Sequence, residues 1–376
     1  MFHTLEKKYV SLQSEAREFA KIIEPLAVEA DNMSEMHPGV LAAFRDSQLS
    51  DLMVPAGFGG RFDTVDPMAI CVVREVLMGT SAHVDSLFAL QGIGSYALTT
   101  AGSSAQCEKW LPKIARAEAI PALALTEPEA GSDLKSVSTS FEKAGDGFIL
   151  NGKKSFISNA SCATFFVVFA REAETYSMVL APAETPGISI TPSPEIIAPH
   201  VLGEVEFNQV HLPAGSRIGD PGDGLKLVLA TLGVFRASVA GAAVGLASAA
   251  LEEAVRHTRS RVQFGRPLSR LGPVAQLLAD CWTEIEMARL LTYKAASIAS
   301  RDPDSALNMS SMAKLGATET ASRVVDRCVQ VMGRWGLVRD SKIERLYRQA
   351  RPMRIYEGSS EVLRLGIAKE LTELVE

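Results

Sequence analysis

Paired cysteines, clustered histidines and long blocks of one charge are all missing from this 376-residue sequence. Its six histidines have no ligand spacing, so we expect no metal site. The 38 basic and 44 acidic residues form no lysine or arginine block, which gives little support to a nucleic-acid or membrane-surface role. No CxxC pair occurs among the cysteines, which are typical of buried thiols in a reducing compartment: Cys71, Cys107, Cys162, Cys281 and Cys328.

Targeting and membrane signals are scarce as well. The first twenty residues mix acids and bases without an apolar centre, unlike a secretory signal or a transit peptide. The longest uncharged run of small residues, 237–251, is shorter than a membrane span. We therefore expect a cytoplasmic protein with no membrane partner.

What the sequence does contain is 47% hydrophobic residues over a length that predicts two or three packed units. Residues 1–120 read as helices joined by short loops. Residues 121–222 change to strand and turn patterns such as "TFFVVFA" and "GEVEFNQVHLP", and residues 223–376 are helical again. The predicted order is helical domain, β-domain, helical bundle.

Two patterns in the third block indicate close helix packing. The apolar residues at 274, 277, 278, 281, 285, 288 and 291 form the stripe of a helix that is buried along one side. Gly241 and Gly245 give another helix a face smooth enough for a neighbour to approach closely.

Several kinds of chemistry lack their motifs. "QGIGSYA" at 91–97 imitates a dinucleotide-binding loop, but no βαβ pattern surrounds it and no acid follows at the required distance. No GxSxG elbow, P-loop or HExxH is present either. A hydrolase or a phosphoryl transferase is therefore not supported.

Five short motifs remain, and each taken alone is more often structural than functional. "LTEPEAGSD" (125–133) and "NGKKSFISNA" (151–160) frame the entry to the β-domain, where glycine lets main-chain amides approach an anion or a flavin edge. "RVQFGRP" (261–267) offers an arginine for phosphate, and "QVMGRWG" (330–336) offers an amide donor. "RIYEGSSEVLR" (354–364) contains Glu357, which taken alone is much more typical of an exposed surface acid than of a base.

In this order and spacing the motifs resemble the acyl-CoA dehydrogenase family, from about residue 5 to about residue 370. The resemblance implies an α+β, mostly α fold: an N-terminal helical domain (1–120), a β-barrel-like middle domain (121–222) and a C-terminal four-helix bundle (223–376). It also implies FAD. The positions that match flavin contacts are Leu125, Thr126, Gly131, Ser132, Phe156, Ser158, Ser359 and Glu361. A neighbouring subunit would add Arg261, Gln263, Phe264, Gln330 and Gly333.

The same resemblance implies an enzyme that converts an acyl-CoA to its trans-2-enoyl thioester. Glu357 matches the base that removes the α-proton, while hydride passes from Cβ to flavin N5. Because such a proton is weakly acidic, donors must stabilise the enolate oxygen, and in the family these include the main-chain N–H of the base. Some relatives carry the base just before Arg236, but Phe235 there cannot accept a proton. The positions matching substrate contacts are Ser132, Arg236, Tyr96 and Gly358.

The resemblance further implies a homotetramer built as a dimer of dimers and an electron-transferring flavoprotein as acceptor. Tyr96 closing the acyl cavity would favour short or medium chains, branched ones included, although an ordinary core tyrosine is an equal alternative. An acyl oxidase or a dehydrogenase of carrier-bound acyl groups on the same fold stays open, as does a non-catalytic helical scaffold. Departures at Phe156, Gly233, Arg334 and the pair Leu271-Gly272 leave the carrier and the adenine-end contacts undetermined.

Overall fold

The computed structural model describes residues 5–375, which group into two compact units. The first unit contains the chain up to residue 31, residues 67–85 and everything from residue 233 onward. The second unit contains residues 32–66 and 86–232. The N-terminal helices are thus shared between the units, which division into consecutive blocks did not predict. The block boundaries after residues 120 and 222 stay predictions.

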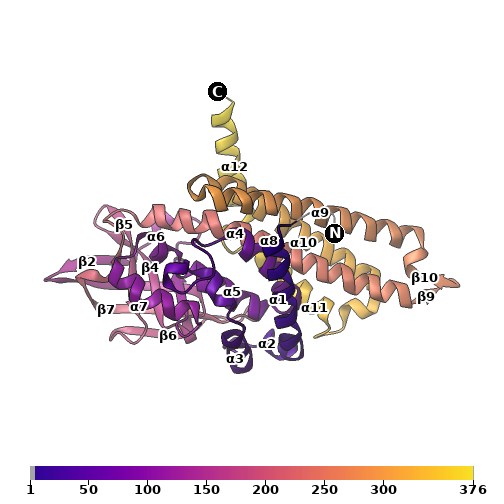
Figure 1. Cartoon of the computed structure of the whole chain (residues 1–376), viewed down its shortest axis with the longest axis horizontal. Coiled ribbons are helices and arrows are strands. Elements are labelled where there is room, and N and C mark those ends of the chain that lie inside the picture. The colour runs from indigo at the N-terminus through magenta and orange to yellow at the C-terminus, as the bar shows by residue number, and fades with distance from the viewer. Residues whose placement is uncertain (1–4, 376) are drawn as a thin grey trace. The chain divides into compact units, whose positions relative to one another are not determined.

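The first unit is built from helices and one short hairpin. Its C-terminal helix projects from the other helices of the unit, and the hairpin lies where two long helices meet (Figure 1). The elements are α1 (Lys7–Ile23), α2 (Ala27–Ala30), α4 (Pro67–Thr80), most of α8 (Gly224–Ser260), β9 (Val262–Gln263), β10 (Arg266–Pro267), α9 (Gly272–Arg301), α10 (Ala306–Met332), α11 (Lys342–Ala350) and α12 (Ser360–Leu374).

Both packing predictions for these helices are confirmed. A Cβ added at Gly241 would lie 2.8 Å from the Cys71 carbonyl oxygen, and one at Gly245 would lie 2.0 Å from that of Glu75. Only glycine therefore allows α4 to lie this close to α8. The predicted stripe on α9 is buried or half-buried along its whole length, whereas Trp282 on another face is exposed.

Helix α8 is long and apolar enough to cross a membrane by composition alone. However, 89% of its most apolar window is buried inside the protein. A helix that is apolar on all sides and covered by other elements is a core helix.

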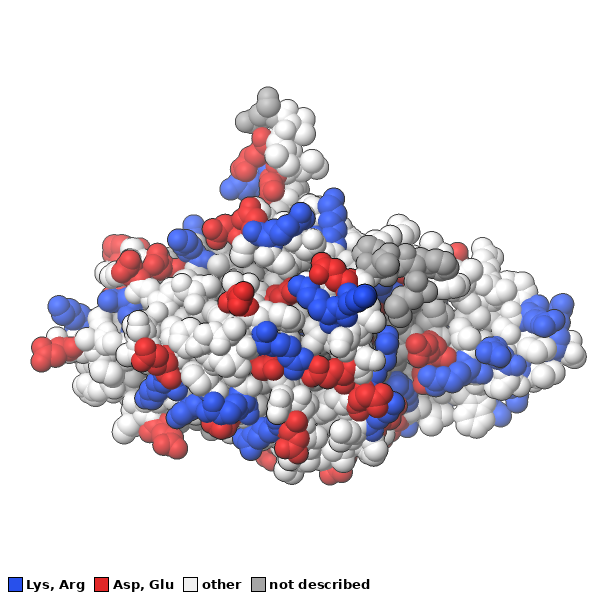
Figure 2. Space-filling view, viewed as in Figure 1, with Lys and Arg blue, Asp and Glu red and all other residues white. Residues whose placement is uncertain are grey.

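Charged side chains of both signs are interspersed over the face shown in Figure 2, without a large patch of one sign.

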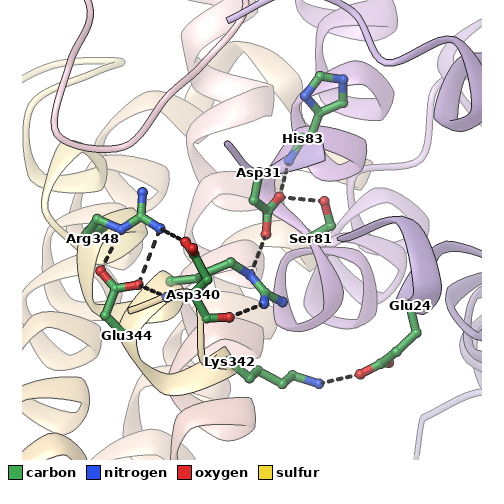
Figure 3. A network of polar contacts seen from close by, with 9 residues as sticks. Glu24, Asp31, Ser81, His83, Asp340, Lys342, Glu344 and Arg348 are labelled. Carbon is green, nitrogen blue, oxygen red and sulfur yellow. Dashed lines mark hydrogen bonds and ion pairs between the residues drawn. The ribbon is translucent and has the colours of Figure 1, made fainter. Parts of the chain in front are cut away.

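A buried carboxylate joins the N-terminal helices to α11. Asp31 accepts hydrogen bonds from Ser81 Oγ (2.6 Å), His83 N (3.2 Å) and Arg345 Nε (3.3 Å) (Figure 3). Burial raises the pKa of Asp31, against the effect of these donors. Because each carboxylate oxygen has a partner, the network ties distant parts of the first unit together.

The second unit centres on one eight-stranded sheet, in the order β6-β7-β3-β2-β4-β5-β8 with β1 parallel to β4. Phe141, Phe148, Phe166 and Phe207 pack in its core, where the first two rings stack at 4.1 Å. The strands are β1 (Pro121–Ala124), β2 (Ser140–Ala144), β3 (Gly147–Ser158), β4 (Phe165–Glu172), β5 (Thr175–Pro182), β6 (Ile188–Pro192), β7 (Leu202–Pro213) and β8 (Arg217–Ile218).

Helices accompany the sheet in this unit: α3 (Pro38–Ser47), most of α5 (Ala82–Ile93), α6 (Tyr96–Ala101) and α7 (Ser104–Ala115). The segment "QGIGSYA" covers the end of α5 and the start of α6, so no strand precedes its glycines. The rejection of a dinucleotide-binding loop is therefore confirmed. One expectation about cysteines was wrong: Cys162 is only partly buried, because it lies in a surface turn after β3.

Candidate active site

The predicted base lies in the first unit, in an unusual turn just before α12. Glu357 has φ +53° and Gly358 has φ +102°, so two successive residues adopt left-handed backbone conformations. A Cβ added at Gly358 would lie 2.8 Å from Arg236 Nη2, which explains why glycine follows the acid. A non-glycine residue in this conformation costs free energy of about 1–3 kcal/mol and needs support from its surroundings.

Two buried cations give that support by binding consecutive carbonyl groups. Arg236 Nε donates to the Glu357 oxygen at 2.8 Å, and Lys314 Nζ donates to the Gly358 oxygen at 2.7 Å. Arg236 is anchored in turn on Ser311 Oγ at 3.1 Å. Arg236 comes from α8, and Lys314 and Ser311 come from α10. The turn therefore depends on helices more than forty residues away in sequence.

The environment of the Glu357 carboxyl is that of a functional acid. The residue is half-buried, but its Oε2 is inaccessible to solvent and has no hydrogen-bond partner among the described residues. Desolvation raises the pKa of Glu357, against the opposing effect of Arg74, Arg236 and Lys314. An ordinary exposed acid would have neither property. A raised pKa is also what a general base working near neutral pH requires.

A buried ion pair borders this acid. Arg74, on α4, donates from Nε and Nη2 to the two carboxylate oxygens of Asp85 at 3.0 and 2.7 Å. Its Nη1 donates to Ser238 Oγ on α8 at 3.0 Å. Fork-to-carboxylate pairing fixes the orientation of both side chains. The positive charge of Arg74 acts to lower the pKa of both Glu357 and Tyr356.

In the second unit, a bulge in β3 presents Phe156. The pairing of β3 with β7 shifts register between Lys154 and Ile157, and Phe156 has φ +55° and a side chain 48% exposed. Phe156 has no paired residue in the β3–β7 register, and its N–H donates instead to the side chain of Glu204 on β7, with 3.2 Å to Oε1. Glu204 Oε2 accepts from Ser155 Oγ at 2.7 Å. A bulge held in this way aims an aromatic ring outward at a chosen place.

The segment after β1 lies beside this bulge. Ser155 N donates to the Thr126 oxygen at 2.8 Å, and Lys154 Nζ donates to the Leu125 oxygen at 2.9 Å. Gly131 and Ser132 follow in an exposed loop, where the atom closest to an added Gly131 Cβ is Thr126 Cγ2 at 4.0 Å. The structure therefore brings together the predicted flavin contacts of the two motifs.

Lys154 and Glu127 form a buried ion pair under that loop. Nζ and Oε1 are 2.9 Å apart, with side chains 0% and 3% exposed. Glu127 also accepts from Ser138 N (2.6 Å) and Thr139 N (3.0 Å). Burial alone would raise the pKa of Glu127, but the bonds from Lys154 and Thr139 lower it to about 2. Desolvation lowers the pKa of Lys154 to about 8.

Ser158, at the end of β3, is engaged by a histidine. His200 Nε2 lies 3.3 Å from Ser158 Oγ and 3.1 Å from Ser86 Oγ. Desolvation lowers the pKa of His200 to about 4, so the ring is neutral at neutral pH. A neutral imidazole between two hydroxyls orients both of them.

The residues predicted to reach a neighbouring subunit are exposed in the first unit. Phe264, with φ +53° and a side chain 89% exposed, forms the turn of the β9–β10 hairpin with Gly265. Gly333 follows the last residue of α10 with φ +59°, and Gln330 lies on the exposed face of α10. Arg334 stacks over its neighbour Trp335, with 5.4 Å to the ring centroid. Arg261 directly precedes β9 and Gln263 is the last residue of β9, and both are exposed.

The remaining predicted residues have local roles in the structure. Ser359 is the N-cap of α12, accepting from Val362 N at 3.4 Å, and Glu361 is exposed in the first turn. Tyr96 begins α6 and is buried in the second unit. Flavin or substrate contacts at these positions stay predictions.

The groups present fit FAD. In the second unit an outward aromatic ring on the β3 bulge lies beside the segment that carries the Thr126 and Ser132 hydroxyls and an open glycine loop. Arginine and amide donors for phosphate and adenine lie on the exposed hairpin and α10. This donor set suits a molecule with a flat ring at one end and a pyrophosphate in the middle.

Comparison with known proteins agrees with this chemistry. Models of the N-terminal, middle and C-terminal domains of acyl-CoA dehydrogenase match residues 7–118, 122–210 and 222–372. The chain is 33% identical to cyclohex-1-ene-1-carbonyl-CoA dehydrogenase of Geobacter metallireducens over 99% of both chains. The chain belongs to the acyl-CoA dehydrogenase family. It is also 32% identical to glutaryl-CoA dehydrogenase of Desulfococcus multivorans, over 98% of this chain and 97% of the other.

Solved structures of this family share the whole fold. A glutaryl-coenzyme A dehydrogenase in complex with glutaryl-CoA is 30% identical, covers 99% of this chain and 97% of its own, and gives a TM-score of 0.94. A chain in a structure of the electron transferring flavoprotein of Acidaminococcus fermentans covers 99% of both chains at 28% identity and a TM-score of 0.94. A glutaryl-CoA dehydrogenase of Mycobacterium smegmatis in complex with FADH2 covers 98% and 95%, at 25% identity and a TM-score of 0.91.

The predicted family, order of domains, cofactor and reaction class are therefore confirmed. This acyl-CoA dehydrogenase is an FAD-dependent oxidoreductase that forms the α,β double bond of an acyl-CoA.

Sequence reasoning missed several residues that build the site. Glu127 and Lys154 both lie inside the motifs 125–133 and 151–160. A charged residue within a segment that is expected to be buried indicates a buried partner, so this pair could have been found from the sequence. Glu204, His200, Arg74 and Lys314 carried no signal, because each meets its partner only through the fold.

Proposed function

We propose that Glu357 removes the α-proton of a short or medium, branched or cyclic acyl-CoA. One observation carries the assignment of the base: Glu357 Oε2 is solvent-inaccessible and without a partner among the described residues, in a turn that two buried cations hold. A desolvated carboxylate with a free lone pair is prepared to accept a proton.

The main chain of the same residue serves the substrate carbonyl. The Glu357 N–H donates to none of the described groups, so it can donate to the thioester oxygen. That donation stabilises the negative charge that develops as the α-proton leaves. Bound FAD supplies the hydride acceptor. In this proposal Phe156, Thr126 and Ser158 orient FAD, and Ser132 contacts both cofactor and substrate.

Charge around the base sets its working range. Glu357 must be ionised to accept the proton, and Arg236 and Lys314 favour the ionised form against desolvation. Arg236, which binds the Glu357 carbonyl, also lies beside the thioester in this proposal. The rate of flavin reduction therefore rises with pH through the pKa of Glu357.

The substrate class is supported by relatives and by one residue. The relatives at 33% and 32% identity are named as dehydrogenases of cyclohex-1-ene-1-carbonyl-CoA and of glutaryl-CoA. Both acyl groups are small, and one is branched at the α-carbon. Tyr96, buried at the start of α6, limits the depth of the acyl cavity in this proposal.

We further propose a homotetramer in which FAD contacts Arg261, Gln263 and Phe264 of a neighbouring subunit, with Gln330 and Gly333. A groove of about 670 Å³ along α8 and α9, whose lining includes exposed Trp282, offers an apolar surface for association. An electron-transferring flavoprotein is the proposed acceptor, in line with the relative found in a structure of that protein. The cytoplasm is the proposed location.

The test of the base is Glu357→Gln. Glutamine keeps the size of the side chain and the main-chain N–H, so FAD content and acyl-CoA binding should persist. Flavin reduction should fall by at least about 10² to 10⁴, the usual worth of general-base catalysis. Stopped-flow bleaching with isobutyryl-, cyclohexanecarbonyl-, octanoyl- and palmitoyl-CoA measures both the loss and the substrate preference. A variant that bleaches within a few-fold of wild type would mean that another group takes the proton.

A further inference from the structure

Helix α10 carries a lysine that the reaction described above does not use directly. Lys314 is 0% exposed, and the only hydrogen bond that its ammonium group makes among the described residues is the one from Nζ to the Gly358 oxygen. No carboxylate of the described residues lies within 4.0 Å of it. An ammonium group buried with a single acceptor is costly unless negative charge lies nearby.

The surroundings of this lysine identify where that negative charge is. Desolvation lowers the pKa of Lys314 to about 8, and Glu357 is the largest of the opposing influences. Arg74 is already paired with Asp85, and Arg236 is bound to the Glu357 carbonyl and Ser311. The charged or titratable groups acting on Glu357 or Lys314 are Arg74, Asp85, Arg236, Glu319, Tyr356 and Glu361.

The position of Lys314 also affects the backbone. It binds the carbonyl of the second left-handed residue, while Arg236 binds the carbonyl of the first. Without the lysine, the Gly358 oxygen would lose its partner in a partly buried site. A strained turn persists only while its surroundings hold it.

We propose that Lys314 is a positioning residue for the base: its bond to Gly358 fixes the Glu357–Gly358 turn, and its ammonium balances the Glu357 carboxylate. This inference rests on the proposed role of Glu357. It assigns Lys314 a part in the reaction without any contact with substrate or cofactor.

Lys314→Met tests the inference, because methionine has nearly the same shape but no charge and no donor. The plateau rate of flavin reduction should fall about tenfold or more, since small displacements of a reacting group are costly. The acid limb of the pH–rate profile should also move up by about one pH unit, because a neighbouring positive charge is lost. A purely structural role would lower stability without moving that limb, and an unmoved limb overturns the inference.

Thr318→Val is the matched control on the same helix. Thr318 is fully buried one turn further on, and its hydroxyl donates to the main-chain oxygens of Lys314 and Leu315 on the same helix. This variant should keep the wild-type limb while reporting the effect of a buried change in α10. If its limb moves as far as that of Lys314→Met, the charge of Lys314 is not the cause.

A double-mutant cycle on stability covers the case in which Lys314→Met folds poorly. Melting of the FAD-bound protein is compared for both single variants and for Lys314→Met with Glu357→Gln. Because glutamine leaves no unbalanced carboxylate, the lysine change should lower the melting temperature less in that background. Equal losses in the two backgrounds, or a double variant as unfolded as Lys314→Met, contradict the inference.

The two proposals fail in different ways. If Glu357→Gln reduces its flavin at the wild-type rate, the base itself is wrongly assigned. A different result rejects only the role of Lys314. In that case Glu357→Gln is inactive, the acid limb of the pH–rate profile of Lys314→Met stays at the wild-type position, and the losses of melting temperature in the double-mutant cycle are additive.

Discussion

Removing Lys154 should destabilise the second unit and release FAD. The ammonium bridges the Leu125 oxygen and Glu127 Oε1, both at 2.9 Å, and so joins β3 to the segment after β1. Lys154→Met keeps most of the packing volume but leaves the carboxylate without its counter-ion. The loop with Gly131 and Ser132 then loses part of its anchor.

The magnitude follows from the two pKa shifts. Lowering the pKa of Glu127 from 4.5 to about 2 is worth at most about 3 kcal/mol, after allowance for solvent screening. Lowering the pKa of Lys154 from 10.5 to about 8 costs about the same. The intact pair therefore adds little net stability at neutral pH. Deleting one partner leaves the other as a buried charge without a counter-ion, which lowers the free energy of unfolding by about 3–5 kcal/mol.

The pH dependence has a definite sign. Because the folded pKa of Glu127 lies below its unfolded value, its contribution is complete above pH 4.5 and is lost as pH falls towards 2. The lowered pKa of Lys154 likewise makes wild type gain stability between pH 8 and 10.5. Lys154→Met lacks that gain, so its deficit should grow above pH 8 and shrink below pH 4.5.

The assay is chemical unfolding at several pH values, together with the 450 to 280 nm absorbance ratio after desalting. Lys153→Met is the matched control. Lys153 is the residue before Lys154, but its side chain is half-exposed and its Nζ lies 4.0 Å from Glu204 Oε2. It should change stability by less than about 1 kcal/mol. If Lys154→Met retains FAD and lies within about 1 kcal/mol of wild type at pH 7, the pair does not anchor the loop.

Three further outcomes are expected. Arg261→Ala should lose FAD and melt lower, because a ligand that binds only the folded state stabilises it; wild-type FAD affinity would count against the shared site. Gly245→Ala should lower the free energy of unfolding by about 3 kcal/mol or more, because the added Cβ overlaps the Glu75 carbonyl. Gly316→Ala should be neutral or stabilising, because its Cβ would meet Leu291 at an ordinary 3.6 Å. Similar melting temperatures for the two variants would refute the packing argument. Glu357→Gln should raise the melting temperature above pH 4.5 and not below it, because the raised pKa means that the charged form is disfavoured in the fold.

Some of the site could be predicted because its signals are local. The loop at Gly131 and the strand that contains Phe156 both follow from neighbouring residues. The bulge that turns Phe156 outward could not be predicted in this way. It depends on Glu204, which is 48 residues away on β7.

The sequence by itself determined the order of helices and strands, the buried stripe of α9 and the glycine contacts of α8. Periodicity and side-chain size act within a few residues, so they can be read without the fold. Tertiary structure alone decided how the N-terminal helices divide between two units and which cations surround Glu357. Arg74, Arg236 and Lys314 come from three helices far apart in the chain, and an isolated charge in a sequence does not indicate its partner. Burial then changes what those charges do, because desolvation acts only after the helices have packed.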